Sequence, residues 1–409
     1  MRALADLRPL RESPAFRRLW LGTTASGFGG QMSTFAVLYY VWESTRDAAA
    51  VGLVGLAAGV PVIVLALAGT AFLDHVDRKR LALACSGIPI VVTSLMAVVA
   101  FTGLGGVPAM LTLVAVNAAC GALGSPARRT FLPAILSGDR LAAGLALNHL
   151  SFQLAMLAGP ALAGLLTAAA GVAWCFVADA VTFVAALAGI RGLPGGVAPG
   201  SGRPGPAAVL AGITYAVSTP EVRGALLADL AATLLSMPVA LFPVLNAERF
   251  DGRPEVLGLF TSALAVGGVV ASAFSGLASR AGRAGIIMLA SGAVWAVTLG
   301  AAGLVTALPA VLALVAVAGA ADTWSVVARG TVVQTVTPPE YQGRVAALEH
   351  VVGVAGPDLG NVRAGLVASA TSAGASLAIG GAAALVATGL IALSTPALRR
   401  FRTLAAAER

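Results

Sequence analysis

Long apolar runs alternate with short charged or Gly/Pro-rich segments along the whole chain. A run of about 20 apolar residues is long enough to cross a bilayer as a helix. The first six predicted spans cover 17–42, 48–72, 81–103, 108–126, 142–169 and 173–190. The second six cover 221–246, 255–278, 285–306, 308–328, 345–370 and 373–395. The pattern therefore predicts an all-α integral membrane protein with twelve transmembrane helices.

The composition agrees with this class. Hydrophobic residues make up 58% of the chain and charged residues 11%, whereas soluble domains carry about 25% charged residues. The net charge of +8 does not indicate nucleic-acid binding, because the basic residues are scattered among apolar runs and form no basic face. The three cysteines lie singly within predicted spans and are interpreted as small apolar core residues. We expect a lipid bilayer as partner, and no metal or cofactor.

The loop 69–80 sets the orientation of the helices. It contains Lys79, the only lysine of the chain, between two arginines. Short cytoplasmic loops collect basic residues, so this loop is predicted to lie inside. On that assignment 22 of the 26 Lys and Arg residues lie inside. Both termini are then cytoplasmic, and the Arg-, Ala- and Gly-rich usage favours a bacterial protein of the cytoplasmic (inner) membrane.

The chain divides into two similar halves. A Gly/Pro-rich stretch covers 191–206, and a surface helix is predicted over 207–219. The predicted domains are 1–190, the linker 191–219, and 220–409. Residues 14–17 match 220–223, and 127–130 match 328–331, in the same order. Repeats of this kind predict two six-helix pseudo-symmetric bundles.

Four aspartates lie inside predicted spans, where ionised groups are costly and tend to serve function. Asp229 lies close to the middle of its span, which suits a group that binds and releases a proton; a structural hydrogen bond to a neighbouring helix is the alternative. Asp322 is a second coupling candidate, although pairing with loop arginines also explains it. Asp358 is a third. Asp179 is expected near the outer end of its span, in contact with headgroups or water.

Uncharged and basic polar residues mark a candidate substrate cavity. The cavity candidates are Gln31, Asn117, Asn148, His149, Gln153 and Arg363. Hydrogen bonding between helices is the alternative for the uncharged ones. Arg363 favours an anionic group or extends to the outer interface. Glu349 and His350 lie close to the inner end of the eleventh span, where placement at a helix end explains them as well as chemistry does.

Four motifs resemble the major facilitator superfamily, closest to its bacterial branch of macrolide-efflux and enterobactin-exporter proteins. The loop 74–80 is similar to the branch's loop between spans 2 and 3, and 276–283 looks like a second copy of it. Residues 158–164 resemble the span 5 motif of antiporters, and 331–344 resemble the segment between spans 10 and 11. The resemblance implies alternating access driven by an ion gradient, usually of protons, around a central cavity, in a fold that is usually complete as a monomer.

The resemblance also implies roles for individual residues. The gating motif would comprise Gly69, Asp74, Arg78, Lys79, Arg280 and Arg283. The antiporter-like motif would comprise Gly159, Pro160 and Gly164. A carboxylate such as that of Asp74 can accept hydrogen bonds from a helix N-terminus and hold the inner side closed; a solvated topology signal is the alternative. The branch often has an acid at the position of Gly30, which this chain lacks.

The sequence thus favours a secondary active exporter, a proton-coupled antiporter of small amphipathic molecules such as drugs (multidrug efflux) or siderophores. The alternatives are a facilitator or importer of a small solute, and a transport-inactive membrane sensor, which the missing acid at Gly30 favours. An enzyme is disfavoured because no nucleotide-binding, zinc or nucleophile motif is present in the sequence.

Overall fold

The computed structural model describes residues 6–68, 77–129, 131–191, 193, 206–274 and 282–402. These residues form helices and connecting turns without a strand, as the apolar pattern predicts. Ten helices in the described part are long and apolar enough to cross a membrane. The predicted spans 17–42 and 345–370 are helical as well but are not among these ten, so the count of twelve stays a prediction.

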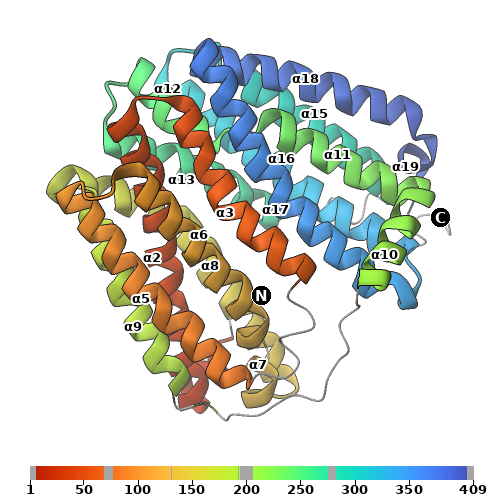
Figure 1. The fold of residues 1–409 in the computed structure, drawn as a ribbon. Helices are drawn as coiled ribbons and strands as arrows, with labels where there is room; N and C mark the ends of the chain where they lie inside the picture. Colours follow the sequence, from red (N-terminus) through yellow and green to blue (C-terminus); the bar gives the residue numbers. More distant parts are fainter. Residues whose placement is uncertain are drawn as a thin grey trace. The chain divides into compact units, whose positions relative to one another are not determined.

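Two compact units form in the described chain (Figure 1). Unit 1 comprises the described residues of 1–45, 60–203 and 254–262. Unit 2 comprises those of 46–59, 204–253 and 263–409. Unit 1 thus holds most of the described residues of 1–190 and unit 2 most of those of 220–409, apart from two short segments, 46–59 and 254–262.

Unit 1 contains α1 (Arg8–Glu12), α2 (Pro14–Thr45), α5 (Arg78–Thr102), α6 (Gly106–Arg129), α7 (Phe131–Ile135), α8 (Asp139–Ala170) and α9 (Ala173–Arg191). It also holds the last part of α3 (Ala48–Ala68) and the first part of α13 (Pro254–Ala273). In this unit α2 packs on α8 and α9, and α5 packs on α6 and α9. Phe16, Leu132, Leu147 and Ile190 lie in one buried cluster that joins α2, α7, α8 and α9.

Unit 2 contains α10 (Pro206–Ser218), α11 (Pro220–Ser236), η1 (Val239–Leu241), α12 (Phe242–Arg249), α15 (Ala284–Ala302), α16 (Leu308–Val336), α17 (Pro339–Ala370), α18 (Ala373–Ser394) and α19 (Pro396–Arg400). Here α11 packs on α17 and α18, and α15 packs on α16 and α18. These pairs correspond one for one to the pairs of unit 1 under the sequence repeat. The packing within each unit therefore supports the internal repeat.

The segment before α11 forms α10, which covers Pro206–Ser218. Its Tyr215 ring stacks on Tyr341 of α17 with the ring centres 4.7 Å apart. The Tyr215 hydroxyl also donates a hydrogen bond of 3.0 Å to the Val336 carbonyl of α16. These contacts attach α10 to the other helices of unit 2.

The predicted span 221–246 is not one continuous helix. α11 ends at Ser236, and the backbone of Met237 is extended, with ψ 124°. The residue before a proline is driven out of the helical region, so Pro238 explains the break. A side chain satisfies part of the interrupted backbone, because the amide of Ala240 donates a 3.0 Å hydrogen bond to Asn361 Oδ1. Polar partners of this kind make a break tolerable at membrane depth.

Candidate functional site

A buried ion pair joins α11 and α16 in unit 2. Arg329 Nη1 contacts Asp229 Oδ1, and the side chains are only 14% and 10% exposed. The second carboxylate oxygen of Asp229 is buried and has no hydrogen-bond partner in the described chain. Asp229, predicted from its depth alone, is therefore held by an arginine 100 positions further along the sequence.

A second carboxylate approaches the same arginine from α17. Glu349 Oε1 lies 3.6 Å from Arg329 Nε, and the Glu349 side chain is 19% exposed. This distance is beyond good hydrogen-bond geometry, so Glu349 is held more loosely than Asp229. α11 packs on both α16 and α17, which brings the three side chains to one place.

Asp322 completes this group, which we call the Arg329 cluster: Asp229, Asp322, Arg329 and Glu349. Asp322 precedes Arg329 by seven residues on α16, which places both on the same helix face about 10 Å apart along the axis. Unlike the other three residues it is exposed, and it is close enough to interact electrostatically with Asp229 and Arg329. The cluster thus holds three carboxyl groups and one guanidinium. When all are ionised, negative charge is in excess.

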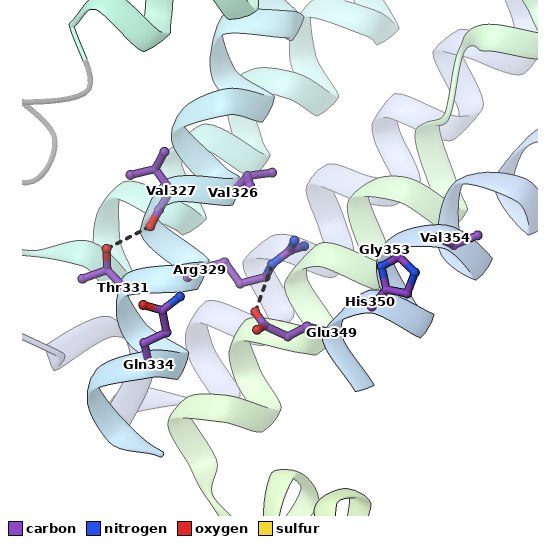
Figure 2. A pocket seen from close by; sticks show the side chains of 10 residues that line it. Val326, Val327, Arg329, Thr331, Gln334, Glu349, His350, Gly353 and Val354 are labelled. Atoms are coloured by element: carbon purple, nitrogen blue, oxygen red, sulfur yellow. Dashed lines mark hydrogen bonds and ion pairs between the residues drawn. The ribbon is translucent and has the colours of Figure 1, made fainter. Parts of the chain in front are cut away.

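A pocket of about 560 Å³ opens beside the cluster, between α16 and α17. Figure 2 shows Arg329 and Glu349 pointing toward each other from the two helices, with His350 further along α17. The lining residues are Val326, Val327, Arg329, Gly330, Thr331, Gln334, Glu349, His350, Gly353 and Val354. Apolar and hydrogen-bonding groups therefore share one cavity, a mixture typical of small-molecule sites.

Unit 1 has no matching acidic group among its described residues. The repeat places Arg128 of α6 at the position of Arg329, and Thr23 of α2 at that of Asp229. Arg128 lies beside the thiols of Cys85 and Cys120 and has no described carboxylate partner. The Thr23 hydroxyl bonds to its own helix, at the Leu19 carbonyl, over 2.9 Å. The excess of acid is therefore a property of unit 2.

Asp358 and Arg363 of α17 stay outside the cluster. The Asp358 side chain is half-buried and packs so closely against Gly59 of α3 that a Cβ at position 59 would collide with its carboxylate. No described side chain donates a hydrogen bond to this carboxylate. Arg363 Nε donates a hydrogen bond of 3.1 Å to the Leu234 carbonyl. A cation near the C-terminal end of a helix interacts favourably with the helix dipole, so Arg363 stabilises the end of α11.

The expectation that Asp179 touches headgroups or water is wrong. Asp179 is fully buried between α9 and α2, with 0% exposure. The Ser33 hydroxyl donates a 2.6 Å hydrogen bond to its carboxylate, and the Thr182 hydroxyl lies 3.4 Å from the other oxygen. Position along a helix does not reveal which face a residue occupies, and Asp179 faces its neighbour rather than the surface.

The cavity candidates of unit 1 do not form one group. Gln31 of α2 packs against Gly159 of α8. Asn117 is partly buried on α6. On α8, Asn148 and Gln153 are partly buried, whereas His149 is exposed. The described contacts join none of these side chains to one another.

Comparison with known proteins identifies the family. The model of the transmembrane secretion effector family matches residues 4–408. The chain belongs to this family, a branch of the major facilitator superfamily. The resemblance predicted from the motifs is thereby confirmed, and the chain is a multi-pass membrane transporter rather than an enzyme.

Named relatives support the same assignment. The enterobactin exporter EntS of Shigella boydii serotype 18 is 27% identical over 407 residues, which cover 98% of this chain and 96% of that protein. EntS of Escherichia coli O139:H28 has the same identity and coverage. Both relatives span nearly the whole transporter.

Solved structures agree in fold. A bacterial homologue of the iron transporter ferroportin, in its inward-facing state, has a TM-score of 0.71 at 17% identity over 93% of this chain and 98% of that one. The nucleoside transporter NupG has a TM-score of 0.72 at 13% identity over 95% and 100%. At these identities the likeness shows the transporter fold alone.

The residues of the predicted antiporter-like motif lie on α8, which makes a close crossing with α13 in unit 1. A Cβ on Gly164 of α8 would lie 2.6 Å from the Pro254 carbonyl oxygen, and one on Gly258 of α13 would lie 2.5 Å from the Pro160 carbonyl oxygen. The Ser262 hydroxyl donates a 2.7 Å hydrogen bond to the Leu157 carbonyl across the same crossing. Small residues let the two backbones meet, as in other membrane helix pairs.

Most of the predicted gating motif lies outside the described residues, namely Gly69, Asp74, Arg280 and the side chain of Arg78. The described part begins at Asp77, whose carboxylate caps α5 by accepting hydrogen bonds from the amides of Lys79 and Arg80 at 2.8 and 3.0 Å. Lys79 is partly buried, and Arg283 is exposed directly before α15.

Proposed function

We propose that this transporter is a secondary active exporter that moves small amphipathic molecules, such as drugs or siderophores, in exchange for protons. Its membership of the transmembrane secretion effector family supports export. The relatives named as enterobactin exporters support a substrate of siderophore size and character. The Arg329 cluster is the single observation that supports proton coupling.

The charge balance of the cluster is the reason. The Arg329 guanidinium lies near two carboxylates, in close contact with Asp229 and 3.6 Å from Glu349. Asp322 interacts electrostatically with both Asp229 and Arg329. An unpaired carboxylate removed from water is costly to keep ionised, and a bound proton removes that cost. A group that gains and loses protons according to its partners is what a coupling site requires.

We further propose that transport proceeds by alternating access between the halves 1–190 and 220–409, joined by the linker 191–219. In this scheme the transporter acts as a monomer in the bacterial inner membrane with both termini in the cytoplasm. The positive-inside distribution of arginines supports this orientation. The corresponding helix pairs of the internal repeat pack together in each unit, which supports the division into halves.

Proton movement in everted membrane vesicles tests the proposal. Vesicles with the transporter are energised, and a pH-sensitive dye reports whether cationic drugs, macrolides or catecholate siderophores collapse the gradient. A compound that acts only with the transporter present supports antiport. Asp229→Asn should abolish that response while the protein still reaches the membrane. If no compound moves protons although the protein is inserted and folded, a facilitator or a sensor replaces the antiporter.

A further inference from the structure

The pocket between α16 and α17 combines an apolar wall with hydrogen-bond acceptors. Val326, Val327 and Val354 supply apolar surface. Gln334 and Glu349 supply carbonyl and carboxylate oxygens. The Thr331 hydroxyl donates its hydrogen to the Val327 carbonyl over 2.9 Å, so its oxygen is left to accept. The pocket thus offers acceptor oxygens to a ligand, while Arg329, Gln334 and His350 also line it and supply N–H donors.

Glu349 is the acid through which a ligand in this pocket meets the Arg329 cluster, and Arg329 lines the pocket as well. Glu349 lines the pocket, whereas Asp229 and Asp322 do not. Its side chain is also the most exposed of the paired groups, at 19% against 14% for Arg329. The cation that faces it, Arg329, gives its closest contact to Asp229. A ligand can therefore compete for Glu349 without breaking the tighter pair.

These features select one ligand class. An anion would lie beside Glu349 and near two further acids, and Arg329 already contacts two carboxylates. A cation instead reduces the excess of negative charge. Acceptor oxygens on Thr331, Gln334 and Glu349 favour a cation that carries N–H groups over a quaternary one.

We propose that this pocket binds an amphipathic amine, with its ammonium group paired to Glu349 and its apolar body against the three valines. The inference rests on the proposed function, because it names the substrate class of the same exporter. The ammonium and a proton neutralise the same excess charge of the Arg329 cluster, so binding one disfavours the other. That competition links the substrate to the coupling site.

Equilibrium binding of three matched probes to the purified full-length transporter tests the site. The probes are 2-(2-naphthyl)ethylamine, its N-acetyl amide and 2-naphthylacetate, which share a ring and differ in charge. The amine is expected to bind at least tenfold more tightly than the amide, and the acetate more weakly than both. Glu349→Gln should weaken amine binding by about tenfold to a hundredfold, the range of a hydrogen bond to a charged group. The affinity for the amide should not change.

Glu340→Gln is the matched control, because Glu340 is an exposed acid of the same helix outside the pocket; it should bind all three probes like the wild type. Equal binding of amine and amide by the wild type, or no binding of the amine, overturns the proposal without any variant. Equal losses for amine and amide in Glu349→Gln overturn it too.

Binding is measured without a proton gradient, so the two proposals fail separately. If the amine binds through Glu349 but vesicles show no proton exchange, the antiporter proposal fails and the amine site stands. If protons exchange with other compounds while the amine does not bind, only the amine site fails.

Discussion

Removing Arg329 should destabilise the transporter more than removing Asp229. Arg329→Gln leaves Asp229, Asp322 and Glu349 together without a cation. Asp229→Asn leaves Arg329 with a remaining carboxylate, because Glu349 lies 3.6 Å from its Nε. The asymmetry follows from geometry, since the arginine has a second partner and the aspartate has none.

The expected magnitudes follow from burial. The paired side chains are only 14% and 10% exposed, so solvent screens the pair little. Breaking a buried pair from one side costs about 3–5 kcal/mol, which we expect for Arg329→Gln. Asp229→Asn should cost about 1.5–3 kcal/mol, the value of one hydrogen bond to a charged group. The double variant should be less destabilised than the sum by about 0.5–3 kcal/mol.

Reversible unfolding by sodium dodecyl sulfate in mixed micelles, followed by tryptophan fluorescence, measures these free energies of unfolding. The reasoning is refuted if Arg329→Gln is as stable as Asp229→Asn, or if the losses of the two single variants add fully in the double variant. Either result would mean that the cluster does not act as one electrostatic unit.

Three further variants can be measured by the same unfolding assay. Ser33→Ala removes the 2.6 Å hydrogen bond to the fully buried Asp179, and should cost about 1–3 kcal/mol; wild-type stability would show that Asp179 does not depend on this donor. Gly319→Ala places a Cβ against the Leu264 carbonyl where α16 crosses α13, and should cost about 1–3 kcal/mol through overpacking. Gly389→Ala on α18, where a Cβ meets nothing within 4 Å, should be neutral or slightly stabilising, and equal stability of the two glycine variants would contradict the close crossing.

The helices could be predicted because membrane insertion depends on the length of apolar runs, which a single sequence shows. The predicted span 173–190 and the observed α9 (Ala173–Arg191) differ by one residue. Apolar content does not show where a backbone leaves the helix, so the break after Ser236 was missed. Pro238 was the available signal, since proline restricts the residue before it.

The site could be predicted only in part. The depth of Asp229 in its span marked it as a candidate, but the arginine that holds it lies on another helix. Spacing along one chain does not show which helices meet. The repeat that aligns Arg128 with Arg329 was the signal that could have found Arg329, since it drew attention to a basic residue at the same place in both halves. The Ser33 partner of Asp179 is 146 positions away and left no such signal.

Proton flux through the purified transporter decides whether the Arg329 cluster couples transport. Proteoliposomes with a trapped pH-sensitive dye receive a substrate found in the vesicle screen, and the wild type is compared with Asp229→Asn. Asp251→Asn is the matched control, because Asp251 is exposed and its φ of 59° suits asparagine equally well. We predict substrate-dependent proton flux in the wild type and in Asp251→Asn, and a loss of at least about tenfold in Asp229→Asn. Undiminished flux in folded, inserted Asp229→Asn would contradict coupling through this cluster.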